Sequence, residues 1–243
     1  PAQTPAWTLP WTLAPRAVPP LERLSVTAFR SYLACPFRFY LKHALRMESI
    51  DTSKRELDAL DFGSVVDQVV EEFGRDDAAR ELADPTAIHK YFSEQLRFVI
   101  ATRYGSKPPL PVQVQTEIAE RRLKAAALAQ AVEYAAGWRI IGTESKFDGE
   151  INGLTVRGRI DRVERHEETG ALRVLDYKTS GKAKSPLEVH TVRRTDDTPD
   201  YATVDVQMKG KERPSGWVDL QLPLYYWAME TEAENGLQLG YFN

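Results

Sequence analysis

The sequence predicts an α/β protein with one central mixed sheet, and three observations support this. Helical patterning fills the first half of the chain, strand-like alternation begins near residue 139, and one more helical stretch precedes a last short strand. Helices followed by a β-β-β-α-β run fit a domain in which helices flank one sheet. The chain has 243 residues, 42% of them hydrophobic and 28% charged, which suffices for one sizeable soluble domain.

We divide the chain into a proline-rich linker, 1–24, and a domain, 25–243, with a mainly helical part over 25–138 and a β-β-β-α-β core over 139–243. The start lacks the layout of a secretory signal, and Pro1 suggests a processed or excised segment. A single cysteine excludes an internal disulfide and fits a reducing, cytoplasmic setting. No apolar run could cross a membrane, so no membrane partner is expected. Because the net charge is -3, nucleic-acid binding would need a local basic surface.

Four helical segments are expected before the strands. Ser25 and Thr27 can cap the first, FRSYLACPFRFYLKHAL, which Pro36 divides or kinks. The second, FGSVVDQVVEEF, carries its valines at helical spacing. Two more are expected at 86–103 and 115–137, and the latter is alanine-rich and strongly helix-forming.

The strands follow as RIIGTESKFDGEI, LTVRGRIDRVER and ALRVLDYK, separated by the loop signals NG and EETG. This pattern predicts an antiparallel three-stranded meander. Residues 181–215 show no clear period, so we expect a long loop, functional or disordered. WVDLQLPLYYWAMETEAEN predicts a helix with Pro223 near its first turn, and GLQLGYFN predicts a closing strand.

The loop of the second hairpin fixes which residues face each other. If Glu167–Gly170 form a four-residue loop, His166 faces Ala171. Counting back along both strands then puts Asp161 opposite Asp176. Directly opposed residues share a face, with Cβ atoms about 5 Å apart.

A lysine joins this acid pair. Lys178 lies two residues beyond Asp176, so strand alternation places it on the same face. Val163 and Val174 pair below as an apolar floor. Three ionisable groups, with Asp161 as the third, are therefore expected to converge at the edge of a core.

Two opposed carboxylates repel each other unless a cation or a proton lies between them. Their oxygens suit Mg²⁺ or Mn²⁺, which can activate water and neutralise charge on a phosphate, while a lysine orients the water or stabilises the pentacoordinate phosphorus. The pattern thus predicts metal-dependent hydrolysis of a phosphodiester. A surface hairpin in which Lys178 merely pairs with its acids fits the spacing equally well.

Several spaced motifs carry a family resemblance: SVTAFRSYLACPFRFYLKHAL, GSVVD, GRIDRVE, LDYKTSG and QLPLYYWA, in this order over residues 25 to 243. The chain resembles RecB- and AddB-like nuclease domains of the PD-(D/E)XK superfamily. The resemblance implies a restriction-endonuclease-like core that uses Mg²⁺ or Mn²⁺. It also implies exonucleolytic cleavage of DNA, as single strands or duplex ends, within a helicase-nuclease protein of repair and recombination.

The resemblance also assigns site residues. It implies that Asp161 and Asp176 hold the metal, that the carbonyl of Tyr177 is a further ligand, and that Lys178 is catalytic.

Three further residues match family positions. Gln221 and Tyr225 match a Q-x-x-x-Y motif that meets the active site or the DNA, and their i, i+4 spacing puts both on one helix face. Alternatively, Tyr225 is a core residue and Gln221 a cap. Glu144 matches an acid of the first strand, although a lone strand glutamate is usually just solvated.

The family pattern is broken at two points. Asp67 stands where relatives carry a histidine ligand, so either a third carboxylate serves the metal or metal binding is weakened; an exposed helix acid is the alternative. Cys35 matches the first of four cysteines that hold an iron-sulfur cluster in some relatives. One thiolate cannot hold such a cluster, so none is expected in this chain, and Cys35 is expected to pack in the core.

Two basic regions are candidates for DNA contact. Arg38, Lys42 and Arg46 recur every four residues beside aromatic residues, a pattern that could follow a single strand, although simple solvation explains it too. The segment 181–215 has nearly balanced charge and follows the acid pair directly, where it could gate DNA entry.

Three hypotheses remain open. The first is a Mg²⁺- or Mn²⁺-dependent deoxyribonuclease centred on the acid pair and Lys178. The second is a catalytically impaired module of the same fold that binds DNA, because Asp67 replaces the histidine. The third is a domain that docks a helicase partner, either a domain or a subunit.

Overall fold

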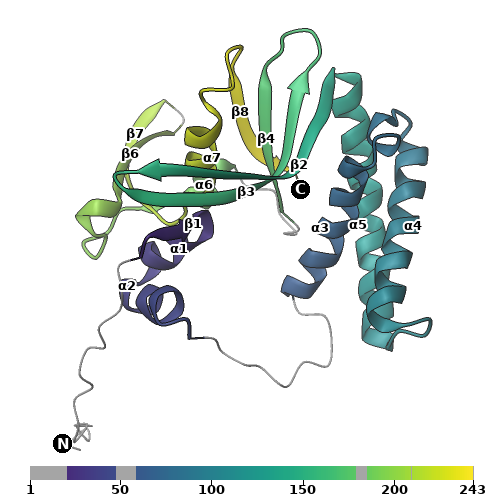
Figure 1. Ribbon diagram of the computed structural model, residues 1–243, viewed down its shortest axis with the longest axis horizontal. Helices are drawn as coiled ribbons and strands as arrows, with labels where there is room; N and C mark the ends of the chain where they lie inside the picture. Colours follow the sequence, from purple (N-terminus) through teal and green to yellow (C-terminus); the bar gives the residue numbers. More distant parts are fainter. Residues whose placement is uncertain (1–20, 48–58, 179–184, 209, 243) are drawn as a thin grey trace, which may run out of the picture.

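A five-stranded mixed sheet forms the middle of the molecule (Figure 1). The computed structural model describes residues 21–47, 59–178, 185–208 and 210–242. β3 pairs with β2 along one edge, while β1 and β4 share its other edge and β8 lies beyond β4. The strands are β1 (Arg23–Ser25), β2 (Trp138–Ile151), β3 (Leu154–His166), β4 (Leu172–Tyr177) and β8 (Leu237–Phe242). The α/β prediction, with its antiparallel meander and closing strand, is confirmed.

The hairpin register is also as predicted. The ladder between β3 and β4 ends with Arg162 opposite Leu175, one step before Asp161 and Asp176. The main-chain N–H of His166 donates to the carbonyl of Ala171 at 2.9 Å, which closes the four-residue loop. The loop length was therefore sufficient to predict which residues of the two strands lie opposite each other.

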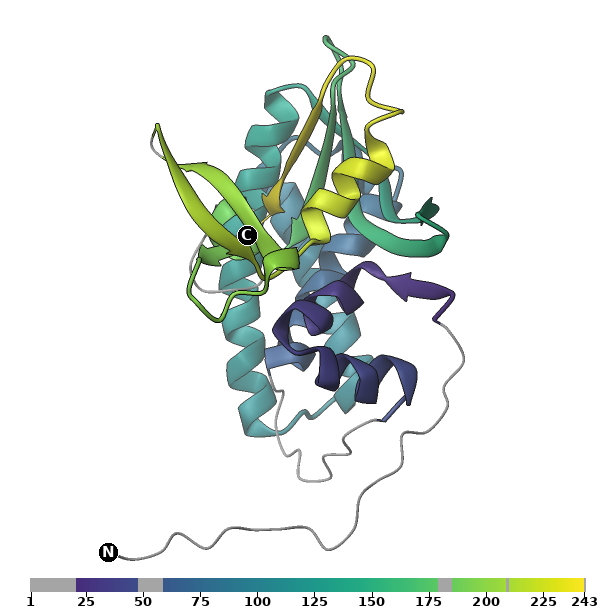
Figure 2. The ribbon, with the colours of Figure 1, turned by 90° about the vertical axis from the view of Figure 1, so that its left-hand side faces the viewer.

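Three long helices cover one face of the sheet (Figure 2). They are α3 (Ala59–Arg75), α4 (Pro85–Tyr104) and α5 (Leu110–Ala135), with a 3-10 turn, η2 (Ala79–Glu81), between the first two. Asp84 caps α4, because its side chain accepts the N–H of Ala87 at 2.9 Å, and Pro85 occupies the first helical position. Valines of α3 and Phe73 are buried against α4 and Ile140, as their helical spacing predicted.

Two shorter helices, α1 (Val26–Ala34) and α7 (Gln221–Met229), pack on the opposite face. α2 (Pro36–Phe39) and the π-helix η1 (Tyr40–Ala44) follow α1 in the chain. Val26, Leu222 and Tyr225 pack on Val163 and Val174 of the sheet, which confirms the apolar floor.

The first predicted helix is divided, as Pro36 indicated. The break lies at Cys35, whose backbone is extended (φ −169°). Its side chain is half-buried and lies outside the buried core, so the expectation that Cys35 packs in the core was wrong. Ser25 stands at the N-cap position, but its side chain makes no capping bond and instead contacts the hydroxyl of Thr27 at 3.1 Å. The expectation that Ser25 caps α1 was therefore wrong.

The expectation of a long loop over 181–215 was wrong for the described part of that segment. It contains a second, antiparallel sheet of order β5-β7-β6. Its elements are α6 (Pro186–His190), β5 (Thr191–Arg193), the 3-10 turn η3 (Asp200–Ala202), β6 (Thr203–Met208) and β7 (Lys211–Trp217). Three-residue β5 is too short to show alternation, and Pro214 and Gly216 interrupt the strand pattern of β7.

The expected linker also needs a correction at its end. Arg23 and Leu24 belong to β1, which pairs in parallel with β3. Residues 1–20 of the expected linker and 179–184 of the expected loop lie outside the described residues. In the described ranges, no helix combines the length and apolar character needed to cross a bilayer.

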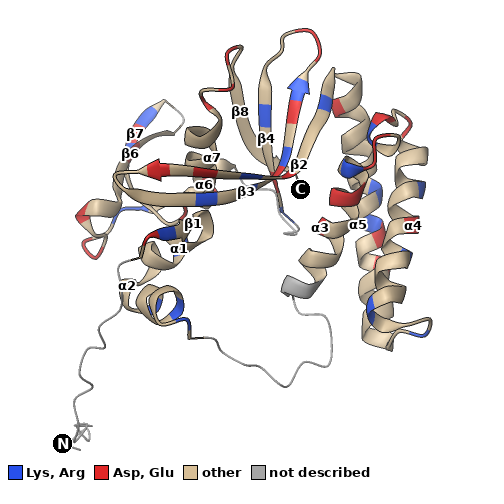
Figure 3. Cartoon of the chain, in the orientation of Figure 1, with Lys and Arg blue, Asp and Glu red and all other residues tan. Residues whose placement is uncertain are grey.

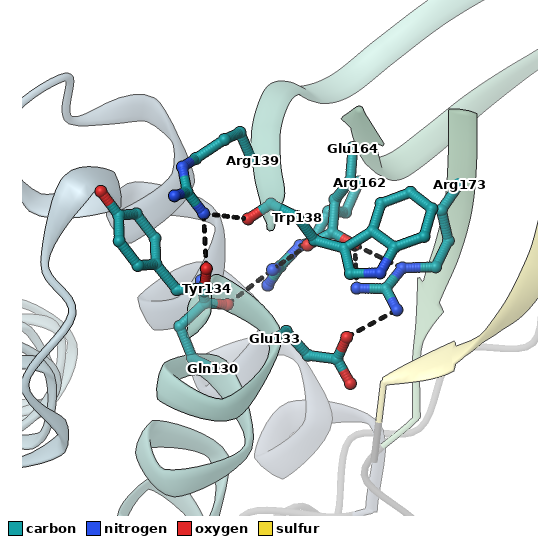
Figure 4. Close-up of polar contacts among 8 residues, drawn as sticks. All are labelled: Gln130, Glu133, Tyr134, Trp138, Arg139, Arg162, Glu164 and Arg173. Atoms are coloured by element: carbon teal, nitrogen blue, oxygen red, sulfur yellow. Dashed lines mark hydrogen bonds and ion pairs between the residues drawn. The ribbon is translucent and has the colours of Figure 1, made fainter. Parts of the chain in front are cut away.

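A buried polar network ties α5 to the sheet (Figure 4). Arg162 and Glu164 are 1% and 0% exposed and form an ion pair. Arg162 also donates to the side-chain oxygen of Gln130 at 2.5 Å. Arg173 donates to Glu164 at 2.6 Å and to Glu133 at 2.7 Å. Two guanidinium groups thus meet two carboxylates and leave no net charge in this part of the core.

Candidate active site

Asp161 and Asp176 meet where β3 and β4 separate. Asp176 is 2% exposed, whereas Asp161 is partly exposed and lines a pocket of about 410 Å³ beside α3. The N–H of Tyr177 donates to Oδ2 of Asp161 at 2.9 Å, and the carboxyl groups of Asp161 and Asp176 lie close enough to interact electrostatically. Two neighbouring buried carboxylates repel each other, so the pair favours a proton or a cation between them.

The protonation of the pair reflects burial and mutual repulsion. Burial, and then the charge of Asp176, raise the pKa of Asp161 to about 7, although the Tyr177 N–H works in the opposite direction. Burial also raises the pKa of Asp176, and Lys178 partly offsets this rise. Such a pair favours any bound cation that can replace its proton.

Lys178 lies directly against the pair. Its ammonium forms an ion pair with Oδ2 of Asp176 and lies 3.5 Å from Oε1 of Gln221. The same ammonium is 5.2 Å from the centre of the Tyr241 ring. The lysine side chain is 34% exposed, so it remains accessible from solvent.

Gln221 and Tyr225 reach the site from α7, on one helix face as their spacing predicted. Gln221 donates its side-chain amide to Oδ1 of Asp176 at 2.5 Å and to the Tyr225 hydroxyl at 3.0 Å. That hydroxyl donates to the carbonyl of Arg159 in β3 at 2.7 Å. Tyr225 is also 2% exposed and packs in the core, so it has both a structural and a site contact.

Asp67 and Glu144 line the same pocket as Asp161. Burial, followed by the charge of Asp176, raises the pKa of Asp67 to about 6, which places this helix acid near the pair rather than in open solvent. Glu144 forms an ion pair with Arg159 and has a left-handed backbone (φ 52°), a strained conformation for a residue inside a strand. Glu144 is therefore not the freely solvated acid that a lone strand glutamate usually is.

The oxygen donors fit a hard divalent cation only in part. Asp161 and Asp176 supply two neighbouring carboxylates in a buried, polar place, as Mg²⁺ and Mn²⁺ prefer. Among the described residues, no three His, Cys, Asp or Glu side chains are arranged as a metal site. Asp67 as a third ligand, and the carbonyl of Tyr177 as a further one, stay predictions.

The Tyr177 side chain leaves the site. Its ring packs on the face of the sheet that α3, α4 and α5 cover, with the Phe242 ring at a centroid distance of 6.1 Å. Strand alternation explains this, because Asp176 and Lys178 face the other way. Only the main chain of Tyr177 can take part in the site.

The predicted basic stripe is not continuous on one helix. Arg38 and Lys42 line a second pocket, of about 910 Å³, together with Arg30 of α1. Arg46 is exposed but lies beyond the end of η1 with a left-handed backbone (φ 54°). The π-helical turn changes the residue spacing, so Arg46 does not continue the helical stripe.

Sequence reasoning missed two residues beside the pair. The carboxylate of Asp219 accepts the N–H of Gln221 at 2.9 Å where α7 begins, and Tyr241 lies opposite Asp176 in the β4–β8 register. An aspartate two residues before the Q-x-x-x-Y motif is a signal for a helix start that could have been used. Tyr241 alternates with apolar residues in a closing strand and gave no signal.

The sequence was compared with models of known protein families and with curated proteins. Residues 23–243 match the family model described as PD-(D/E)XK nuclease superfamily. A search of curated proteins found no match. The mixed sheet with flanking helices agrees with that superfamily, whose nucleases typically use a divalent metal. The chain belongs to the PD-(D/E)XK nuclease superfamily.

Proposed function

We propose that this chain is a Mg²⁺- or Mn²⁺-dependent deoxyribonuclease. Membership of the superfamily suggests a nuclease and a DNA substrate. The observation that carries the proposal is the acid pair, Asp161 and Asp176, with Lys178 in direct contact with Asp176. Two carboxylates beside a cationic side chain are suited to phosphodiester hydrolysis.

Each side chain has a separate task. Asp161 and Asp176 would hold the metal, which when bound neutralises phosphate charge and lowers the pKa of water. The Lys178 ammonium lies where it can orient the attacking water or stabilise negative charge that develops on the phosphate. Gln221 holds Asp176 in place through its amide, and Tyr225 fixes Gln221 to the backbone of β3.

The surface near α1 suits a single polynucleotide strand. Three cations, Arg30, Arg38 and Lys42, line the pocket of about 910 Å³ beside apolar side chains of Ala34 and Leu41. Figure 3 shows Lys or Arg positions, in blue, on α1 and on the segment that follows it. Phosphates can contact the cations while bases lie on the apolar atoms.

The pocket also connects with the site at one residue. Arg30 lies 4.0 Å from the carboxylate of Asp219, which begins the helix that carries Gln221. A strand bound along Arg38 and Lys42 would therefore lead toward the acid pair. Removal of nucleotides from an end, within a helicase-nuclease protein of DNA repair, extends this proposal on the strength of the motif resemblance.

One observation favours a catalytically impaired DNA-binding module as the second candidate. Asp67 takes the place of a histidine, and in the described part of the chain it does not complete a group of three metal-binding side chains. Metal binding would then be too weak for cleavage, while the basic pocket would still bind DNA.

Incubation with four DNA forms distinguishes these functions. Linear and circular DNA, single- and double-stranded, are incubated with Mn²⁺, with Mg²⁺ or with a chelator. The nuclease predicts cleavage that the chelator abolishes, and an exonuclease spares the circles. DNA binding without cleavage under any metal condition would contradict the nuclease and support the impaired module.

A further inference from the structure

His190 is a buried histidine next to the site that no sequence pattern singled out. It ends α6 and is 3% exposed. Nδ1 lies 2.9 Å from the main-chain oxygen of Asp219, and Nε2 lies 2.8 Å from the hydroxyl of Tyr241. A carbonyl oxygen can only accept, so Nδ1 carries the proton, and in the neutral ring Nε2 accepts the hydroxyl hydrogen of Tyr241.

One bond of His190 leads to Lys178. Tyr241 pairs with Asp176 in the sheet register, and its ring lies 5.2 Å from the Lys178 ammonium. Burial, and then the charges of Asp176 and Asp219, raise the pKa of Tyr241, so its hydroxyl keeps the hydrogen that bonds to His190. The ring is thus held at a fixed place beside the lysine.

The other bond leads to Gln221. His190 holds the carbonyl of Asp219, and its own carbonyl accepts the N–H of Val218 at 2.9 Å. The carboxylate of Asp219 in turn accepts the main-chain N–H of Gln221 at 2.9 Å. The start of α7, and with it the Gln221 amide on Asp176, is therefore tied to His190.

We propose that His190 is a positioning residue that fixes Lys178, through Tyr241, and Gln221, through Asp219, around Asp176. The inference rests on the nuclease function proposed above. It gives the second sheet a task, because β5 begins directly after His190 and anchors the histidine against the site. The side-chain partners of His190 in the described part of the chain are Asp219 and Tyr241, neither of them a predicted metal ligand, so its effect on the site is geometric.

Three substitutions separate the two bonds. His190→Phe keeps a ring and removes both bonds. His190→Asn keeps a donor near the Nδ1 position and loses only the bond to Tyr241, whereas Tyr241→Phe loses that same bond and keeps its ring beside Lys178. The matched control is His89→Phe, because His89 lies on α4 against Glu120, away from the site.

The readouts are the single-turnover rate of Mn²⁺-dependent cleavage of end-labelled DNA, the DNA concentration at half-saturation, and Mn²⁺ affinity by calorimetry. We expect His190→Phe to lower the rate by about 100-fold, with DNA half-saturation and Mn²⁺ affinity within about twofold of wild type. His190→Asn and Tyr241→Phe should each lower the rate by about tenfold. The double variant, His190→Asn with Tyr241→Phe, should cleave no more slowly than either single variant, because both substitutions remove the same hydrogen bond between His190 and Tyr241.

Each outcome decides. A wild type that cleaves, with variants that melt earlier but cleave at the wild-type rate, would overturn the positioning role alone. The positioning role would also be overturned if the rate reductions of the two single variants multiplied in the double variant, because His190 and Tyr241 would then act separately. A wild type that cleaves no DNA would overturn the proposed function and the positioning role together. If His190→Phe does not fold, the Asn and Tyr241→Phe variants still give the answer.

Discussion

The side-chain amide of Gln221 donates to Oδ1 of Asp176 across 2.5 Å, and this bond joins α7 to the end of β4. The contact places an uncharged donor on a buried carboxylate. It therefore orients Asp176 and leaves the negative charge of the carboxylate available to a cation. The bond also explains how a Q-x-x-x-Y motif on a helix can act together with acids on two strands, since Gln221 bonds both Asp176 and Tyr225.

Gln221→Ala should reduce the single-turnover cleavage rate by about 10- to 100-fold, or about 1.4–2.7 kcal/mol in activation free energy. The carboxylate would lose its donor and turn away from its position. Tyr226→Phe is the control, because Tyr226 lies on the same helix and is 46% exposed. Equal rates for both variants would show that Gln221 does not order the site.

Asp161→Asn should stabilise the metal-free chain at pH 8 and not at pH 4. Asp161 titrates near pH 7 in the folded chain but near its ordinary value, 3.8, when unfolded. The folded state therefore binds the extra proton between these values, and stability falls as pH rises from about 4 to about 7.

The substitution removes this loss, on the order of 2 kcal/mol at pH 8 after allowance for solvent screening. Chemical denaturation with a chelator present, at both pH values, measures it. Asp148→Asn is the control, because that carboxylate is 70% exposed and pairs with Arg157 at the surface. A pH-independent change in Asp161→Asn would contradict the raised pKa of Asp161 in the folded chain.

Glu164→Gln should destabilise the fold by about 3–5 kcal/mol, because the buried guanidinium groups of Arg162 and Arg173 would lose their shared carboxylate. Urea unfolding measures this loss. Glu167→Gln should cost less than about 1 kcal/mol, since Glu167 is 54% exposed in its ion pair with Arg139. Similar losses in the free energy of unfolding for the two variants would mean that the buried network of Figure 4 stabilises the fold no more than a surface ion pair does.

Arg38→Glu combined with Lys42→Glu should weaken single-stranded DNA binding and flatten its salt dependence. Two lost phosphate contacts lower the slope of log K against log salt by about 1.4. Fluorescence anisotropy over a salt series measures the slope. Lys124→Glu, an exposed position on α5, should leave it unchanged; an unchanged slope in the double variant would place the DNA elsewhere.

Local rules were enough for the part of the fold that carries the acids. A four-residue loop and strand alternation predicted the faces of Asp161, Asp176 and Lys178, because pairing in a tight hairpin leaves no freedom of register. The helix spacing of Gln221 and Tyr225 was equally local.

The remainder depends on contacts between distant segments. His190 and Tyr241 are 51 residues apart in the sequence and meet because the fold brings the end of α6 next to β8. β1 has three residues after a proline-rich stretch, so only its pairing with β3 defines it. The left-handed backbone of Glu144 could not be predicted from the local sequence, because such a conformation persists only where the surrounding structure imposes it.

Lys178→Ala tests the proposed chemistry most directly. End-labelled linear DNA is incubated with wild type, Lys178→Ala and the exposed-lysine control Lys90→Ala in Mn²⁺ and in chelator, with melting temperature and Mn²⁺ affinity measured on the same samples. We predict that Lys178→Ala cuts at least about 1,000-fold more slowly while it still folds and still binds Mn²⁺, and that Lys90→Ala matches wild type. Undiminished metal-dependent cutting by Lys178→Ala would contradict the role assigned to this lysine beside Asp176.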